Sequence, residues 1–503
     1  MNNLFNARFT YSQKKFLLIF ILIFLLGMYF RFVNYDTRWT LSQDQARDAL
    51  IADYSIKTNL LPLIGPHSSA GDFSFGPFYY WFIIFFKLFS DSIISSWIGF
   101  TILSCTTIVV FGLIGYKLFS KAGCIIFALV SALASSSILH STDMLNPIPI
   151  PLFVSLIILY LIFFLKSHKL IYSFFIGTCI GLAINFHFEA FLLLPLLLIT
   201  PSFLQADSRS KILGFISSLV GLSVSMIPLM IFDITHQNIL SKNFYLYTFS
   251  GQQNASVTLS WLKEIISFWP QFFGEVLFNQ PLMGYPVMII IVSAFVICFI
   301  KKIPFPLTTK IIAITFLIQI FLLHFYNGVR SPVYMLVFHP IIIFLTSFSI
   351  YIFFKLNKYL GIILIVLFCL LTMIQNSKII EQKNQLSDLR KLQTEIAVKS
   401  PGKILLFERP ESAIVSLPLY YLYQYEDKLD SSGYRIGVCE NKDLKDDFGQ
   451  TIGSNCPKEP SPFGGDGHFQ LFDLSNLSED QLDQIGFTAV SEKKLFNNLY
   501  KNY

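Results

Sequence analysis

The stretch FLLIFILIFLLGMYFRF, residues Phe16–Phe32, decides the fold class, because it is predominantly apolar and long enough to cross a bilayer as a helix. Arg8, Lys14 and Lys15 precede it, and no small-residue cleavage site follows it, so we expect a retained first span rather than a removed leader. The positive charges before the span predict a cytoplasmic N-terminus.

The composition of the whole chain predicts a polytopic α-helical membrane protein. Of its 503 residues, 54% are hydrophobic and 14% are charged. The net charge of +6 does not indicate nucleic acid, because the Lys and Arg residues lie in small clusters between apolar runs, where membrane orientation explains them. We therefore expect the lipid bilayer, and no nucleic acid, as a partner. The expected location is the plasma or inner membrane of the cell.

Ten further segments have the length and composition of membrane spans, which makes about eleven crossings. They are Ser95 to Tyr116, Ala122 to Leu139, Ile148 to Leu165, Ile171 to Phe186, Ala190 to Leu204, Ile212 to Phe232, Met283 to Ile300, Ile311 to Tyr326, Val333 to Phe354 and Leu360 to Ile374.

Pro77 to Phe89 is apolar but is not counted as a span. If this segment does not cross, the basic clusters from Lys117 onward fall on the cytoplasmic side together with the N-terminus. The positive-inside rule thus favours a juxtamembrane or re-entrant helix, although a short true span stays an alternative. The same count places the loops after Asn34, His140 and His187 outside the cell.

The chain is expected to form two domains. Residues 1–375 hold the spans, with 34–94 as a first extracytoplasmic loop that carries juxtamembrane helices. Residues 376–503 shift to a charged, soluble-like composition and predict a small extracytoplasmic α/β domain. Cys439 and Cys456 are its only cysteines, and an oxidising exterior permits either a disulfide between them or two unpaired thiols.

The first predicted loop carries the best candidate chemistry, Gln43-Asp44-Gln45-Ala46-Arg47-Asp48. Two carboxylates and a guanidinium beside a membrane need a role or a partner. If the segment is helical, Asp44 and Asp48 share one face. The alternative interpretation is a solvated helix surface with local ion pairs.

The order of the polar motifs resembles that of lipid-linked-sugar glycosyltransferases of the GT-C superfamily, in particular bacterial relatives of the protein O-mannosyltransferases. The resemblance covers about residues 10 to 375 and rests on motif order and topology. Its motifs are Trp39, Gln43 to Asp48, Leu63 to Pro66, Phe75 to Tyr80, His140 to Pro147, Asn185 to Glu189, Arg330 to Tyr334 and His339-Pro340.

The resemblance implies an enzyme that moves one sugar from a polyprenyl-phosphate carrier to an acceptor on the outer face of the membrane. The acceptor, whether protein, lipid or glycan, is not identified. Asp44 matches the acidic position of the family's first loop and is the expected general base. The family often has two adjacent acids there, whereas Gln45 follows Asp44, so Asp48 is the remaining candidate for a second carboxylate.

Several residues are candidates for binding the phosphate and the substrate. Arg330, next to a Pro-led helix, suits a phosphate, although interfacial snorkelling explains it equally well. Arg47 is a second candidate, or is simply the partner of Asp44. The remaining predicted substrate contacts are Tyr79, His187 and Tyr334.

No cofactor is certain, and a divalent metal ion stays possible. Its candidate ligands are Asp44, His140, Asp143, His187 and Glu189, although histidines at a membrane interface are more often hydrogen-bonded anchors. The alternative function is a transporter or flippase for a lipid-linked sugar or another small molecule. Such proteins place ionisable residues near the bilayer midplane, whereas here the charges lie at the outer ends of the spans.

Overall fold

The computed structural model describes the chain in segments, which form two compact units. The described residues are 11–69, 71–204, 207–250, 263, 265–325, 330–382, 386–409, 413–440, 443–445, 451–454, 456–465 and 469–500. The first unit comprises Met1–Tyr35, Leu63–Tyr79 and Ile98–Glu381, and the second comprises Asp36–Pro62, Tyr80–Trp97 and Gln382–Tyr503.

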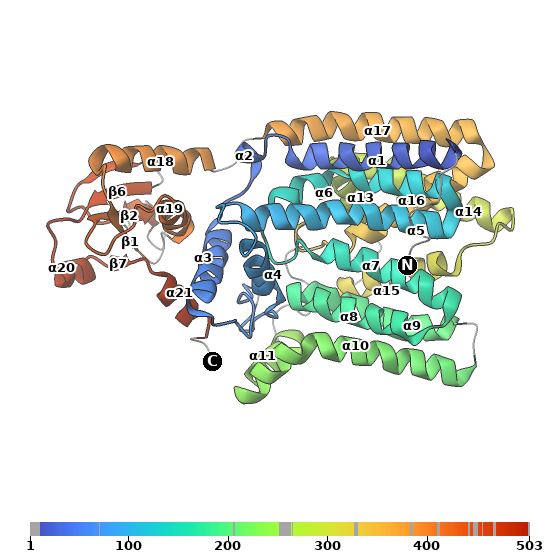
Figure 1. The fold of residues 1–503 in the computed structure, drawn as a ribbon, viewed down its shortest axis with the longest axis horizontal. Helices are drawn as coiled ribbons and strands as arrows, with labels where there is room; N and C mark the ends of the chain where they lie inside the picture. The colour runs from blue at the N-terminus through green and yellow to red at the C-terminus, as the bar shows by residue number, and fades with distance from the viewer. Residues whose placement is uncertain are drawn as a thin grey trace, which may run out of the picture. The chain divides into compact units, whose positions relative to one another are not determined.

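The first unit is a bundle of apolar helices (Figure 1). Its helices are α1 (Tyr11–Phe32), most of α5 (Ser95–Leu133), α6 (Ser135–Leu139), α7 (Ile150–Ser167), α8 (Leu170–Phe186), α9 (Pro195–Phe203), α10 (Ser208–Thr235), α11 (Ile239–Tyr245), α13 (Phe268–Phe278), α14 (Gly284–Ile300), α15 (Leu307–His324), α16 (His339–Leu356) and α17 (Lys358–Glu381). Short turns of 3-10 helix, η1 (His140–Thr142) and η2 (Phe188–Leu193), connect some of them.

The predicted spans fall on helices, which confirms the multi-pass helical fold. Eight helices of the described residues are long and apolar enough to cross a membrane. One of these, α5, has a φ of 80° at Ser120 and so consists of two helices, and α8 and α9 are shorter apolar helices at two further predicted spans. The predicted span from Val333 starts too early, because α16 begins at His339, with Pro340 in its first turn.

Small residues let α8 and α10 pack closely (Figure 1). A Cβ added to Gly177 would lie 1.8 Å from the Ser218 carbonyl oxygen, and one added to Gly221 would lie 2.0 Å from the Phe174 carbonyl oxygen. Helices that pack in lipid commonly use small residues for such close approach. Ile184 of α8 and four residues of α10 contribute to the lining of the apolar cavity described below.

Arg31 lies in the last turn of the first span, α1. Its side chain is buried, and its guanidinium donates to the carbonyl oxygens of Gly27 at 3.0 Å and Ala132 at 2.9 Å, and to Ser104 Oγ at 3.0 Å. A charge inside an apolar bundle is tolerated when its donors are satisfied in this way. Arg31 thereby ties α1 to both ends of the helix pair within α5.

The apolar segment Pro77 to Phe89 forms α4 (Phe78–Lys87), a helix of 10 residues. At a rise of about 1.5 Å per residue it is roughly 15 Å long, about half of the hydrocarbon core. Its length therefore suits the predicted juxtamembrane helix better than a crossing.

The second unit combines a sheet with helices from two distant parts of the chain. Five strands pair in the order β5-β6-β2-β1-β7, in which β1 and β2 are parallel and the other neighbours are antiparallel. The strands are β1 (Ile404–Glu408), β2 (Tyr434–Glu440), β5 (Pro462–Gly465), β6 (Phe469–Asp473) and β7 (Thr488–Ala489), with a separate hairpin of β3 (Asp443–Lys445) and β4 (Thr451–Ser454). Its helices are α2 (Tyr35–Arg38), α3 (Gln43–Thr58), most of α4, α18 (Leu386–Lys399), α19 (Ala413–Tyr425), α20 (Glu479–Gln484) and α21 (Glu492–Asn498).

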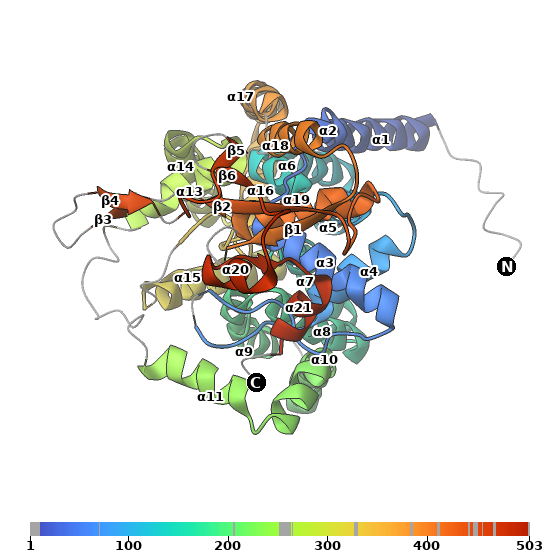
Figure 2. The same cartoon turned by 90° about the vertical axis from the view of Figure 1, so that its left-hand side faces the viewer.

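Figure 2 shows α18 beside β5 and α19 beside β1. One face of the sheet buries Phe407, Phe472 and Phe487 together with Cys439 and Cys456, which form a disulfide in the structure. The α/β character of the C-terminal region agrees with the short strands expected there.

The second unit is larger than the predicted domain 376–503. Along the chain its last segment begins at Gln382, and the unit also includes α3 and most of α4 from the predicted first loop. Helix α3 packs against α19 and α21. Tyr54 of α3 contacts Phe496 of α21, with ring centroids 5.0 Å apart.

Candidate functional site

The candidate base lies in the first turn of α3, whose start is fixed by a capping box. The Ser42 side chain accepts from the Gln45 backbone N–H, and Gln45 Oε1 accepts from the Ser42 backbone N–H at 2.8 Å. Gln45 is therefore a structural residue, which explains an amide at this position. The Ser-x-x-Gln spacing is a sequence signal that predicts this helix start, and the sequence analysis missed it.

Arg47 joins the two carboxylates of the motif. Its Nη1 lies 2.8 Å from Asp44 Oδ1, and its Nε lies 2.9 Å from Asp48 Oδ1. The two carboxylates differ in environment, because the side chain of Asp44 is 62% exposed and that of Asp48 is 4% exposed. The Tyr80 hydroxyl also donates to Asp48 Oδ1, at 3.0 Å. The structure thus brings together Asp44, Arg47 and Asp48 and adds a tyrosine that sequence reasoning missed.

This arrangement gives Asp44 and Asp48 different environments. Burial raises the pKa of Asp48, while Arg47 and the Tyr80 hydroxyl favour its charged form. Asp48 holds the guanidinium that in turn contacts Asp44. Asp44 is the more exposed of the two acids.

We expect Tyr80→Phe to move the acid limb of the pH–activity profile to higher pH. The Tyr80 hydroxyl lowers the pKa of Asp48, so its loss raises that pKa and protonates Asp48 at a higher pH, which releases Arg47. The measurement is kcat/KM for the transfer reaction proposed below, between pH 4 and pH 8. Tyr79→Phe is the matched control, because the Tyr79 hydroxyl donates to the Met144 carbonyl instead. An unmoved acid limb in Tyr80→Phe contradicts a positioning role for Asp48.

The other predicted substrate residues lie in the first unit. The His187 ring is buried and stacks on Phe75, Phe188 and Tyr334, with centroid distances of 5.0, 4.6 and 5.3 Å. Tyr334 is 37% exposed, so its outer ring face is the accessible part of this stack. His187 supports the ring rather than presenting a nitrogen to solvent.

Two further candidates have structural contacts. Arg330 Nη2 donates to the Leu323 carbonyl at 3.2 Å, and its guanidinium lies 5.7 Å from the centre of the Phe268 ring. Tyr79 is fully buried, and its hydroxyl donates to the Met144 carbonyl at 2.8 Å. Tyr79 therefore packs inside the first unit, and Arg330 contacts α15 through Leu323. The substrate-binding roles of both residues stay predictions.

The predicted metal ligands are divided between the two units, with Asp44 in the second and the other four in the first. His140 Nδ1 lies 3.0 Å from Asp143 Oδ2, which makes a local pair. Among the described residues, no group of three or more His, Cys, Asp or Glu side chains is placed to hold a metal ion. A divalent metal stays a prediction, and the mechanism proposed below does not depend on one.

An apolar cavity of about 190 Å³ lies in the first unit. Its lining comes mainly from aromatic and methionine side chains of the segment before α4, of η2 and of α10 and α11. Asp233 is its charged lining residue, and it accepts from the backbone N–H groups of Leu240 and Ser241. Such a cavity suits an apolar chain.

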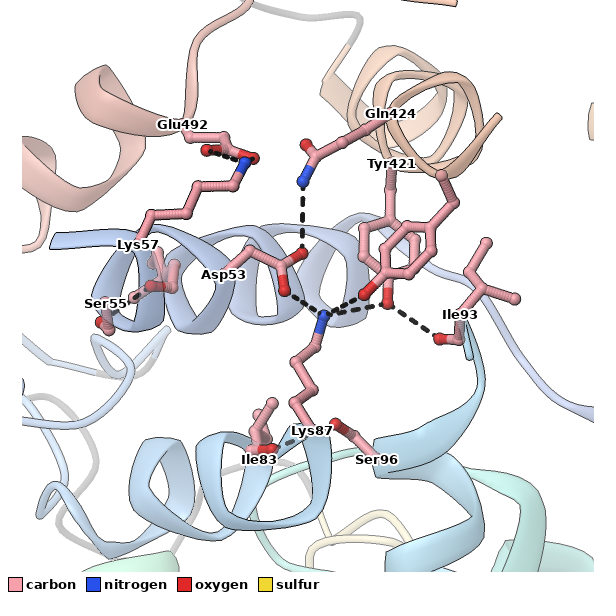
Figure 3. A network of polar contacts seen from close by, with 12 residues as sticks. Asp53, Ser55, Lys57, Ile83, Lys87, Ile93, Ser96, Tyr421, Gln424 and Glu492 are labelled. Carbon is pink, nitrogen blue, oxygen red and sulfur yellow. Dashed lines mark hydrogen bonds and ion pairs between the residues drawn. The ribbon is translucent and has the colours of Figure 1, made fainter. Parts of the chain in front are cut away.

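The second unit contains a buried ion pair that no motif predicted (Figure 3). Lys87 Nζ at the end of α4 lies 2.5 Å from Asp53 Oδ1 on α3, and the Lys87 side chain is 3% exposed. It also donates to the hydroxyls of Tyr421 and Tyr425 on α19, at 3.3 and 2.8 Å. Gln424 donates to Asp53 from the same helix, at 3.4 Å.

Comparisons with known proteins agree with this fold. Residues 74–232 match the family described as dolichyl-phosphate-mannose-protein mannosyltransferase. A comparison of the whole sequence with curated proteins finds no match.

Among solved structures, ArnT from Cupriavidus metallidurans in the apo state is 10% identical, with a TM-score of 0.58 over 85% of this chain and 93% of ArnT. ArnT bound to undecaprenyl phosphate is 10% identical, with a TM-score of 0.57 over 90% of this chain and 97% of ArnT. The Archaeoglobus fulgidus oligosaccharyltransferase in complex with zinc and sulfate is 11% identical, with a TM-score of 0.52 over 84% of this chain and 68% of that enzyme.

In two other structures of the archaeal oligosaccharyltransferase, the chain covers 56% of the length of that enzyme. At these identities the likeness concerns the fold. The chain is a multi-pass membrane protein that shares the fold of ArnT, and its residues 74–232 match the dolichyl-phosphate-mannose-protein mannosyltransferase family.

Proposed function

We propose that the protein is a glycosyltransferase that moves a sugar from a polyprenyl-phosphate carrier to an acceptor hydroxyl on the outer face of the membrane. The family match and the shared fold with ArnT bound to undecaprenyl phosphate support a lipid-linked donor. The sugar and the acceptor are set by pocket shape and are not part of this proposal.

The observation that carries the proposal is the divided environment of the two carboxylates. Asp44 is exposed and is held by Arg47, which is itself fixed by the buried Asp48. An exposed carboxylate whose direction is fixed can accept the proton of an incoming hydroxyl. We propose Asp44 as that base.

Arg47 is the proposed phosphate ligand. Its contacts with Asp44 and Asp48 use Nη1 and Nε, which leaves further N–H donors of the guanidinium for phosphate oxygens. Helix α3 begins at Gln43, four residues before Arg47, and its N-terminus adds a favourable field for an anion.

In the proposed step, the acceptor oxygen forms a bond to the anomeric carbon while the bond from that carbon to the phosphate oxygen breaks. The acceptor proton goes to the Asp44 carboxylate and then to water. The released polyprenyl phosphate carries the additional negative charge, which Arg47 stabilises as it develops.

The test is transfer by the purified protein in proteoliposomes that contain a radiolabelled polyprenyl-phosphate sugar and a crude acceptor fraction from the cell envelope. We expect label to move from the lipid to a water-soluble or glycolipid product. If the labelled lipid crosses the bilayer without loss of its sugar, the protein is a flippase and the proposal fails.

A further inference from the structure

The second unit contains a polar cavity of about 470 Å³ beside the buried ion pair. Parts of α3, the end of α4 with the turn after it, and α19 form its walls. Its volume lies in the range of roughly 300 to 1,000 Å³ that is common for small-molecule sites. The lining residues that bear on its chemistry are Asp53, Lys57, Lys87, Asp91, Gln424 and Tyr425.

The polar side chains around the ion pair hold one another through hydrogen bonds. Lys87 is buried and is held by Asp53 at 2.5 Å (Figure 3). The Tyr425 hydroxyl also accepts from Lys87 Nζ, at 2.8 Å. Gln424 is fixed by its hydrogen bond to Asp53. Polar groups whose partners are already set provide a preorganised surface for a ligand.

The charges that line the cavity balance. Asp53 and Asp91 are acidic, and Lys57 and Lys87 are basic, so the lining carries no net formal charge. Lys57 is also paired, with Glu492 at 2.9 Å, as Lys87 is with Asp53. A phosphate or a polyamine would meet an opposing charge for each attractive one, so the lining favours a neutral ligand.

The lining of the cavity contains both hydrogen-bond donors and hydrogen-bond acceptors. Carboxylates and the Gln424 amide oxygen accept, the Lys57 ammonium and the Gln424 amide N–H groups donate, and the Tyr425 hydroxyl does both. The three N–H groups of Lys87 are taken up by Asp53, Tyr421 and Tyr425. A ligand that matches such a lining carries several hydroxyls, each a donor and an acceptor. The Tyr425 ring and the aliphatic residues Ile56 and Leu88 offer contact to C–H faces. These are the features of a sugar ring.

We propose that this cavity binds a neutral sugar ring of the acceptor, an assignment that rests on the proposed function. Asp53 and Asp44 lie on the same helix nine residues apart, which is about 14 Å along its axis. Nine residues are about two and a half helical turns, so the two side chains leave opposite faces of α3. An acceptor that places one ring in the cavity and a hydroxyl at Asp44 is therefore an extended glycan that passes around the helix.

Binding is tested with the full-length protein in nanodiscs by saturation-transfer NMR. The probes are the neutral trisaccharides maltotriose, mannotriose and N-acetylchitotriose, with inorganic phosphate and spermidine as charged probes. Ser90→Trp fills the cavity from an exposed lining position, and Ser92→Trp is the matched control on the same exposed turn outside the lining. Gln424→Ala is the second variant and removes hydrogen-bonding groups without added bulk.

We expect saturable binding of at least one trisaccharide, at least about tenfold weaker in Ser90→Trp and Gln424→Ala and unchanged in Ser92→Trp. The idea is overturned if no trisaccharide binds, if binding is equal in Ser90→Trp, or if only a charged probe binds. The readout needs no donor. If a sugar binds but no transfer occurs, the proposed function is wrong and the cavity is still a sugar site. If transfer occurs but no sugar binds, the proposed function holds and the cavity assignment is wrong.

Discussion

Asp44→Asn is expected to lower sugar transfer by about 10³-fold, within the range that positioned general bases supply. The amide keeps the shape of the side chain but cannot take the acceptor proton. The change should not disturb folding, because the Asp44–Arg47 pair is largely exposed and such pairs contribute at most about 1 kcal/mol. The measurement is the initial rate of label transfer in proteoliposomes at saturating donor, with KM for the donor determined in parallel.

Asp388→Asn is the matched control for this change. Asp388 is an exposed aspartate on α18 that forms an i,i+3 pair with Lys391 at 3.0 Å, as Asp44 does with Arg47. It should transfer at the wild-type rate. A rate within threefold of wild type for Asp44→Asn would mean that Asp44 takes no proton, and the mechanism would then need another base.

The spans were predictable because lipid imposes a length and a composition on each one. Phe16 to Phe32 and Met283 to Ile300 carry this signal alone, with no reference to their neighbours. Residues that form loops or bends gave weaker signals. The predicted span from Val333 overshot the start of α16, because apolar residues also fill the turns before His339.

The local half of the candidate site was also predictable. Asp44, Arg47 and Asp48 lie within one helical turn and a half, so their spacing alone places them together. The contact of Tyr80 with Asp48 joins two helices separated by the loop between them, and no spacing rule reports such a contact. The exposure of each carboxylate was equally unpredictable from the sequence, since Asp44 is exposed and Asp48 is buried although both lie on one face of the helix.

The ion pair of Lys87 was out of reach of sequence reasoning for the same reason. Lys87 ends an apolar helix, where a cation that reaches water is the ordinary interpretation. Its tyrosine partners Tyr421 and Tyr425 lie in the C-terminal part of the chain, which the sequence analysis treated as a separate domain.

Lys87→Met is expected to lower the free energy of unfolding of the second unit by about 3 to 5 kcal/mol, as breaking a buried ion pair commonly does. The substitution leaves Asp53 buried without its ammonium partner, and it leaves the hydroxyls of Tyr421 and Tyr425 without a donor from Lys87. The measurement is thermal unfolding of the protein in detergent, followed by near-ultraviolet circular dichroism of the buried tyrosines.

The loss of stability in Lys87→Met should depend on pH, and the pKa of Asp53 sets the direction of this dependence. Burial raises this pKa above its ordinary value of 3.8, and the charge of Lys87 opposes the rise. Without Lys87 the folded-state pKa rises further. A raised carboxyl pKa gives stability that is fully present below the unfolded value and is lost as pH rises through the folded value. The difference from wild type should therefore be smallest near pH 4 and should grow toward neutral pH.

Two further variants separate the unpaired charge from lost packing. Lys391→Met breaks an exposed pair on α18 in the same unit and should change stability by less than about 1 kcal/mol. Lys87→Met combined with Asp53→Leu removes both charges and should recover part of the loss, because no unpaired carboxylate stays buried. If the double variant is no more stable than Lys87→Met and the loss is the same at pH 4 and pH 7, Lys87 acts through packing of its aliphatic stem. The ion pair would then contribute nothing to the association of α3 and α4 with α19.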